Sequence, residues 1–197
     1  MRITGGSLKG RRITVPGGII RPAMDRMRES IFSILGELSG LSFLDLFSGS
    51  GIIALEAASR GAAYIEAVEI DPLKRKTLLQ NASISPLHIH CRFMPVELYI
   101  KRAKRPFELI FCDPPFPYKY KAELLRSIFA STLVKEGTLL LLHRPKEEQY
   151  ERGFNSAVLN NKLIDSRDYG RSIVDFYRHS CIKFDNNRDF IYLINEG

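Results

Sequence analysis

The sequence predicts an α/β fold, in which a mostly parallel sheet is covered by helices on both faces. Two observations support this prediction. From residue 42 onward, short apolar runs alternate with amphipathic segments of helical period, and this alternation is typical of repeated βαβ units. The chain of 197 residues is also 45% hydrophobic and 26% charged, a composition that suits one globular domain with a substantial core.

The elements are expected in the following order. Residues 1–22 alternate basic, apolar and glycine positions, which predicts a short basic hairpin or arm. A helix capped by Asp25 is expected to run to about Leu38. Strands are then expected at Ser42–Phe47, Tyr64–Ile70, Leu87–Phe93, Phe107–Cys112 and Thr138–His143. Helices are expected between them at Ile52–Arg60, Pro72–Ala82, Val96–Ala103 and Ala122–Leu133. Weaker candidates for strands are Lys162–Ser166, Ser172–Arg178 and Asp189–Ile194. The chain is therefore divided into an arm (1–22), a main domain (23–180) and a tail (181–197).

Basic residues are concentrated at the start of the chain. The net charge is +7, which suits a polyanionic partner. Residues 1–30 contain seven basic residues against two acidic ones. We expect these seven to face phosphate, with an ordinary solvated surface as the alternative. They are Arg2, Lys9, Arg11, Arg12, Arg21, Arg26 and Arg28.

Other classes of protein fit the composition less well. The three cysteines form no C-x-x-C pair and the histidines show no metal-ligand spacing, so we expect neither a disulfide framework nor a metal site. No apolar segment follows the basic N-terminus, and no apolar run is long enough to span a bilayer. We therefore expect a cytoplasmic protein without a membrane partner.

Three expected strands end in residues that could form a site, because ligands of open α/β sheets bind beyond the carboxyl ends of the strands. The first runs into Asp45-Leu46-Phe47-Ser48-Gly49-Ser50-Gly51. Its glycines allow a tight turn and a close ligand approach. The loop is neither G-x-G-x-x-G nor a Gly-Lys-Ser/Thr phosphate loop, and Asp45 suits an ammonium or sulfonium group. A glycine-rich turn without a ligand is the alternative.

The second and fourth strands end in acidic residues. Glu69 can accept hydrogen bonds from both hydroxyls of a ribose, whereas Asp71 can cap the helix that begins at Pro72. The fourth strand ends in Asp113-Pro114-Pro115-Phe116, the most specific motif in the chain. Its carboxylate and free carbonyl match the exocyclic amino group of a flat base, and its ring can stack on that base. A stiff turn is the alternative.

In this order, the motifs resemble a class I S-adenosylmethionine-dependent methyltransferase that acts on a base amino group. Over roughly residues 1–178 the chain more narrowly resembles the RsmD family of 16S rRNA guanine-N2 methyltransferases. Further matching stretches are Arg2-Ile3-x-Gly5-Gly6, Gly10-Arg11, Arg21-Pro22-x-x-Asp25-Arg26-x-Arg28-Glu29, Leu55-Glu56-Ala57-x-Ser59-Arg60-Gly61-Ala62 and Tyr169-Gly170. The chain departs from the family at Ala23-Met24, where Thr-Thr is usual, and at His143-Arg144, where relatives tend to carry Glu. Cys91-Arg92-Phe93-Met94 lacks the acid that often contacts adenine.

The resemblance implies a Rossmann-like, seven-stranded sheet with its last strand antiparallel, preceded by a basic hairpin. It implies S-adenosylmethionine as cofactor and a guanine of 16S rRNA, free or in the small ribosomal subunit, as target of a monomeric enzyme. The residues implied to bind the cofactor are Asp45, Phe47, Gly49, Gly51 and Glu69. Those implied to be catalytic are Asp113, Pro114, Pro115 and Phe116. The alternatives are a DNA adenine-N6 methyltransferase and a non-catalytic RNA-binding assembly factor on the same fold.

Overall fold

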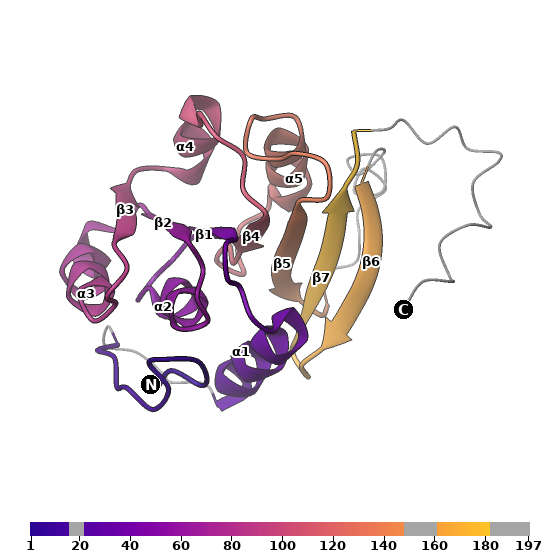
Figure 1. Cartoon of the computed structure of the whole chain (residues 1–197). Coiled ribbons are helices and arrows are strands. Elements are labelled where there is room, and N and C mark those ends of the chain that lie inside the picture. Colours follow the sequence, from indigo (N-terminus) through magenta and orange to yellow (C-terminus); the bar gives the residue numbers. More distant parts are fainter. Residues whose placement is uncertain (16–21, 148–160, 182–197) are drawn as a thin grey trace.

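A sheet of seven strands runs through the centre of the molecule (Figure 1). The structure is a computed structural model that describes residues 1–15, 22–147 and 161–181, and all statements below concern these residues. In spatial order the strands are β3 (Ile89–Phe93), β2 (Tyr64–Glu69), β1 (Ser42–Leu46), β4 (Leu109–Cys112), β5 (Leu139–Pro145), β7 (Ser172–His179) and β6 (Asn161–Asp168). The first five are parallel, and β7 runs antiparallel to both β5 and β6. The expected mostly parallel, seven-stranded sheet is therefore confirmed, and its strand order reverses between β1 and β4, where such folds bind ligands.

Helices cover both faces of the sheet (Figure 1). The helices are α1 (Pro22–Leu35), α2 (Ile52–Ser59), α3 (Pro72–Ala82), α4 (Val96–Arg102) and α5 (Lys121–Phe129). One apolar cluster lies between the sheet and α1, α2 and α3, and a second lies between the sheet and α4 and α5. β1 is buried along its whole length, as expected for a strand covered on both sides. Among the described helices, none is long and apolar enough to cross a membrane.

The expected elements agree with the observed ones to within two residues except at two helices: α5 ends at Phe129 and not at Leu133, and α1 differs at both ends. Asp71 caps α3 as predicted, and its side chain accepts a hydrogen bond from the Leu73 amide at 2.9 Å. The prediction that Asp25 caps the first helix is wrong, because α1 already begins at Pro22. Proline is well suited to a first turn, since its fixed φ is helical and its missing N–H would have had no partner there. The helix also ends before Leu38, because Gly36 takes a left-handed conformation with φ of 67°. The possible strand at Asp189–Ile194 lies outside the described residues.

The first 15 residues fold back on themselves and pack against the main domain. Arg2 and Arg12 form an antiparallel bridge, and the Ile3 amide donates to the Arg11 carbonyl at 3.0 Å. The apolar side chains of this N-terminal segment belong to the same core cluster as α1 and α2, namely Ile3, Leu8 and Ile13. The segment is therefore bound to the domain by its own share of the core.

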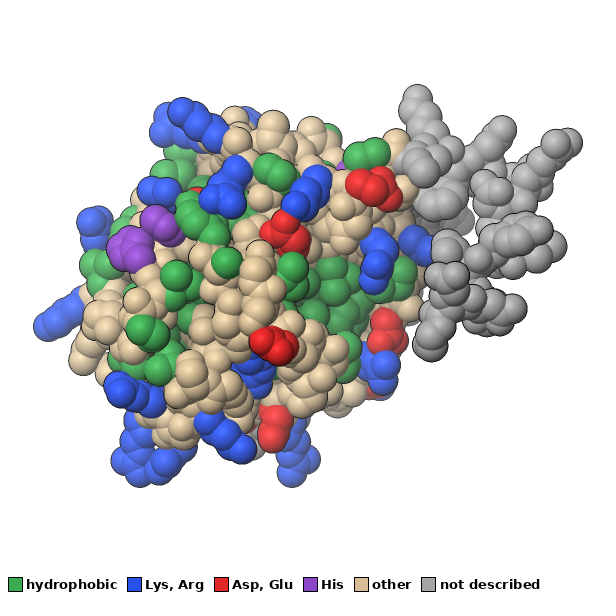
Figure 2. Space-filling view, in the orientation of Figure 1, with side chains coloured by type: hydrophobic (Ala, Val, Ile, Leu, Met, Phe, Trp, Pro, Cys, Tyr) green, Lys and Arg blue, Asp and Glu red, His purple; other side chains and the backbone are tan. Residues whose placement is uncertain are grey.

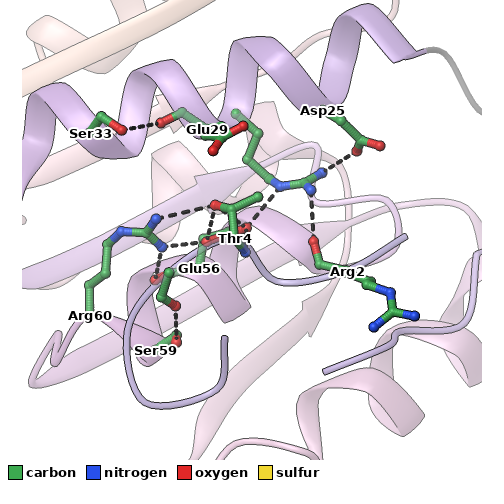
Figure 3. Close-up of polar contacts among 10 residues, drawn as sticks. Arg2, Thr4, Asp25, Glu29, Ser33, Glu56, Ser59 and Arg60 are labelled. Carbon is green, nitrogen blue, oxygen red and sulfur yellow. Dashed lines mark hydrogen bonds and ion pairs between the residues drawn. The ribbon is translucent and has the colours of Figure 1, made fainter. Parts of the chain in front are cut away.

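A buried ionic network joins this segment to α1 and α2 (Figure 3). Glu56 of α2 is completely buried, and its Oε1 accepts hydrogen bonds from the Thr4 amide at 2.8 Å and from Arg28 Nε at 2.9 Å. Arg60 pairs with the other oxygen of Glu56. Arg28 also pairs with Asp25 at 2.9 Å and donates to the Arg2 carbonyl at 2.8 Å. The network holds three parts of the chain together, and its arginines satisfy a carboxylate that could not otherwise be buried.

Candidate functional site

The motifs predicted from the three strand ends lie together at the carboxyl edge of the sheet. Asp45 on β1 stands opposite Phe111 on β4, and Val68, just before Glu69, stands opposite Leu46. Parallel pairing thus brings the ends of β2, β1 and β4 side by side. This edge includes the point where the strand order reverses.

The loop between β1 and α2 is held in an unusual backbone conformation. Phe47, Gly49 and Gly51 all have positive φ, of 64°, 57° and 80°. Phe47 is the only such residue with a side chain among those described, and a bulky residue there stores strain that often marks a functional turn. A Cβ on Gly51 would lie 2.6 Å from Cδ1 of Leu78, so a larger residue there would also displace the end of that side chain. The loop shape is therefore fixed by several independent constraints.

Asp45 holds this loop through hydrogen bonds to its side chain. Its Oδ2 accepts hydrogen bonds from Ser48 Oγ at 2.6 Å and from the Ala54 amide at 3.2 Å, and the residue is 1% exposed. The pKa of Asp45 is raised to about 7, chiefly by burial; the neighbouring negative charges of Asp113 and Glu69 add to the rise, and the Ser48 hydrogen bond opposes it. The three carboxylates therefore lie close enough to repel one another, and a cationic ligand among them would relieve this repulsion.

Glu69 links the loop to the start of α3. Its two carboxylate oxygens accept hydrogen bonds from the amides of Gly49 and Asp71, each at 2.8 Å. A carboxylate has about four acceptor positions, so each oxygen retains capacity for a further donor such as a ribose hydroxyl. The next residue, Ile70, is 57% exposed, and Leu73 is 87% exposed. Apolar surface thus lies beside the acceptors at this strand end.

The turn after β4 is anchored at both of its ends. The Asp113 amide donates to the Leu46 carbonyl at 3.2 Å, which fixes the turn to β1. Lys121 is only 3% exposed, and its Nζ donates to the carbonyls of Phe116 at 3.2 Å and Tyr118 at 2.6 Å. Among the described residues outside helices and strands, no backbone amide donates a hydrogen bond to the carbonyl of Pro114.

The side chains of the turn face neighbours from other strands and loops. Asp113 Oδ1 lies 2.7 Å from Nδ1 of His143 at the end of β5. The Phe116 ring lies 5.4 Å from the His143 ring in an edge-on arrangement. Tyr118 packs edge-on against Phe47 of the β1–α2 loop, with ring centroids 5.7 Å apart. The segment that contains the Asp113-Pro114-Pro115-Phe116 turn is thus in direct contact with the glycine loop.

Two residues of this site were not predicted as site residues. In the sequence, His143 stands out only as part of a departure from the resembled family, and no pattern points to Lys121. A signal for His143 exists in the sequence, because pairing of the fourth and fifth strands in parallel places His143 beside Asp113. No comparable signal marks Lys121, since its partners are backbone carbonyls of a loop.

The basic residues predicted to face phosphate do not form a uniform group. Arg2, Lys9, Arg11, Arg12 and Arg26 are exposed. The prediction that Arg28 faces phosphate is wrong. The residue is 2% exposed and is paired with Glu56 and Asp25, so it cannot present its charge to a polyanion. Arg21 lies outside the described residues. In Figure 2, basic side chains gather along the edge where Figure 1 places the N-terminal segment. Within the described part of the chain, no group of three or more metal-ligating side chains is found.

Comparison with known proteins gives a consistent family. The sequence model described as conserved hypothetical protein 95 matches residues 1–178. The chain is 34% identical to ribosomal RNA small subunit methyltransferase D of Escherichia coli strain K12 over 184 residues, which cover 92% of this chain and 91% of that protein. It is 30% identical to the putative rRNA methyltransferase YlbH of Bacillus subtilis over 190 residues, covering 90% and 98% of the two chains. The solved structure of the putative methyltransferase yhhF from Escherichia coli superposes with a TM-score of 0.78 at 26% identity, covering 91% of this chain and 98% of that one.

Proposed function

The chain belongs to the family described as conserved hypothetical protein 95, which includes ribosomal RNA small subunit methyltransferase D, and from this premise we propose that it methylates the exocyclic N2 amine of a guanine in 16S rRNA. It is an S-adenosylmethionine-dependent methyltransferase of the Rossmann-like class. The observation that supports the specific proposal is the contact of the Asp113-Pro114-Pro115-Phe116 turn with β1 and the glycine loop: the Asp113 amide donates to the Leu46 carbonyl, and Tyr118, just after the turn, packs on Phe47.

The residues at the strand ends fit S-adenosylmethionine. This cofactor would supply an activated methyl group on a cationic sulfur. Asp113 and Glu69 lie close enough to Asp45 for their negative charges to contribute to the rise in its pKa, although burial is the larger cause. A cation bound beside these three carboxyl groups would be favoured by their charge. Glu69 has free acceptor capacity for ribose hydroxyls, and the exposed side chain of Ile70 offers apolar surface for a flat ring. The loop from Phe47 to Gly51 would hold the methionine end.

The Asp113-Pro114-Pro115-Phe116 turn would then orient the target base. Asp113 Oδ1 is bonded to His143, so Oδ2 is the oxygen left to accept a hydrogen bond from the amine. The Pro114 carbonyl would accept the second amine hydrogen, and Phe116 would stack on the ring. With both hydrogens held in the plane of the base, the nitrogen presents its out-of-plane face to the methyl donor. The rate enhancement would come mainly from this positioning.

Asp113 acts in this scheme as an acceptor that orients the amine. A strong base is not required, because the nitrogen becomes acidic once the new N–C bond has formed and then releases a proton. Asp113 is the carboxylate nearest to that proton, and its side chain is 26% exposed, so the proton can pass on to solvent. The target base would have to leave its RNA stack to reach this turn.

The exposed basic residues of the N-terminal segment and α1 would hold the RNA backbone. Arg2, Lys9, Arg11, Arg12 and Arg26 all project from the surface, and each can neutralise a phosphate. They belong to an N-terminal segment and helix that pack directly against α2, which itself follows the cofactor loop. RNA held there would therefore lie beside α2. We further propose that the small ribosomal subunit or its free rRNA is the substrate, that the enzyme acts as a monomer and that it works in the cytoplasm.

Methyl transfer to three candidate substrates tests the proposal. The purified protein and radiolabelled S-adenosylmethionine are incubated with unmodified small ribosomal subunits, free 16S rRNA or duplex DNA, and the products are digested to nucleosides. N2-methylguanosine in the ribosomal RNA is the expected product. N6-methyladenine in DNA would instead establish the adenine-N6 alternative. No transfer, together with no binding of S-adenosylmethionine by calorimetry, would leave a non-catalytic assembly factor.

A further inference from the structure

His143 has a single polar contact among the described residues, and that contact is Asp113. The residue is 3% exposed, and its Nδ1 lies 2.7 Å from Asp113 Oδ1. Its other ring nitrogen, Nε2, is buried and has no hydrogen-bond partner in the described part of the chain. A buried polar side chain normally satisfies both of its polar atoms. This histidine leaves one unsatisfied and uses the other on the carboxylate of the Asp113-Pro114-Pro115-Phe116 turn.

The chemistry of the two side chains decides which of them donates the hydrogen bond between them. An ionised carboxylate can only accept, so the hydrogen must sit on Nδ1 of His143 and point at Asp113. The strand register brings the two residues side by side, because Cys112 pairs with Leu142 in parallel and the next residues on each strand are Asp113 and His143. The end of β5 thus supplies a donor to Asp113.

We propose that His143 is a positioning residue for methyl transfer: its Nδ1–H fixes one oxygen of Asp113 so that the other faces the amine, and its ring supports Phe116. This inference rests on the proposed function, in which Asp113 accepts from the target amine. Asp113 is 26% exposed, so without this bond its carboxylate can turn toward water. The edge-on contact between the rings of His143 and Phe116, with centroids 5.4 Å apart, ties the stacking residue to the same support.

Two substitutions separate positioning from a merely structural role. His143→Asn keeps a donor at the place of Nδ1, because the Asn side-chain amide nitrogen occupies the same position relative to Cβ, but it loses most of the ring packing. His143→Leu keeps apolar volume in the buried site but loses the donor. If His143 positions Asp113, the Asn variant should be more active than the Leu variant. If His143 only fills the core, the Leu variant should be the more stable of the two and its activity should follow its stability.

His179 provides the matched control. It is also a buried histidine on a strand, is 9% exposed, and has its Nδ1 2.5 Å from a side-chain oxygen, that of Asn161. It lies at the end of β7 that pairs with the start of β5, away from the site. The variant His179→Leu should lose stability by a similar mechanism but keep the wild-type kcat.

The experiment measures kcat for methyl transfer to small ribosomal subunits, the Kd of S-adenosylmethionine and the thermal midpoint for all four proteins. We expect His143→Leu to lower kcat by about 10- to 100-fold, the range for a misplaced reacting group, with an unchanged Kd. His143→Asn should recover most of this loss despite a lower thermal midpoint. An unchanged kcat in His143→Leu, or kcat values that simply follow the thermal midpoints, would overturn the inference.

A failure of the proposed function can be told apart from a failure of this inference. If the wild-type protein makes no methylated product with any substrate, the proposed function fails, and crystal structures of the wild type and both variants then decide the role of His143. An Asp113 carboxylate held by residue 143 in the wild type and in His143→Asn, but rotated away in His143→Leu, supports positioning. A carboxylate that stays in place in His143→Leu contradicts it.

Discussion

Glu56 offers a quantitative test of how the N-terminal segment is held. The perturbation is Glu56→Gln, which keeps the volume and one acceptor oxygen but removes the charge. Glu56 is fully buried, and its two arginine partners, Arg28 and Arg60, have side chains that are 3% and 11% exposed. Removing one partner of a buried ion pair costs about 3–5 kcal/mol, because the remaining charge is left buried without compensation.

The structure places the expected value at the lower end of that range. Arg28 keeps Asp25 as a partner at 2.9 Å, and Arg60 also stacks over the Phe32 ring, with Cζ 4.7 Å from the centroid. Neither arginine is therefore left with no favourable contact, and we expect a loss of about 3 kcal/mol in the free energy of unfolding. With a urea slope of about 2 kcal/mol per molar, the unfolding midpoint should fall by about 1.5 M.

The assay is urea unfolding followed by far-UV circular dichroism, because the chain contains no tryptophan for fluorescence. The matched control is Glu123→Gln, since Glu123 pairs with Arg126 at 3.5 Å on the surface of α5 and its side chain is 60% exposed. That variant should lose less than about 0.5 kcal/mol. If Glu56→Gln lowers the free energy of unfolding by less than about 1 kcal/mol, as the control does, the buried network does not stabilise the fold as argued.

Three further predictions concern the site and the RNA surface. Asp113→Ala should abolish methyl transfer while leaving the Kd of S-adenosylmethionine nearly unchanged by calorimetry; an equal loss of both would point to a structural role. Arg12→Gln should reduce the slope of log affinity for rRNA against log salt by about 1, as expected for one lost phosphate contact; an unchanged slope would contradict a phosphate contact at Arg12. Finally, the pKa of Asp45 is about 7 in the folded protein against 3.8 normally, so the native state holds this proton more tightly than the unfolded chain does. The free energy of unfolding of the cofactor-free protein should therefore fall as the pH rises from about 3.8 to about 7, and Asp45→Asn should lack this contribution in urea titrations at several pH values.

Local signals in the sequence were sufficient for most of the fold. The start of α3 follows from Asp71-Pro72, because the cap and the first-turn proline act within a few residues of the chain. The parallel strands follow from short apolar runs such as that ending at Cys112, which only a sheet covered on both faces can bury. The start of α1 was misplaced because Asp25 and Pro22 are both plausible first-turn residues, and the side chain of Asp25 is taken by Arg28.

The site was only partly predictable, because its remaining parts depend on contacts between distant segments. The three strand-end motifs could be identified from their residue types, and the parallel sheet then brings them together. The role of Arg28 could not be inferred from its neighbours in the sequence. Basic residues that lie close together in a sequence are expected at the surface, and the buried partner of Arg28 comes from a distant helix. A signal for that partner was present: Glu56 is the one acidic residue in the apolar helix Ile52–Ser59, and a carboxylate in such a helix requires a cation.

The contacts of the N-terminal segment also impose an order on folding. Thr4 is separated from its partner Glu56 by 52 residues, and Leu8 donates its amide to Ser59 across 51. During synthesis these first residues leave the ribosome before α2 exists, so their contacts with Glu56 and Ser59 can form only after the helix that follows the glycine loop has emerged. A nascent or truncated chain that lacks α2 would therefore display its basic residues on an unanchored peptide, and the proposed RNA-binding surface would be assembled only together with the first part of the cofactor site.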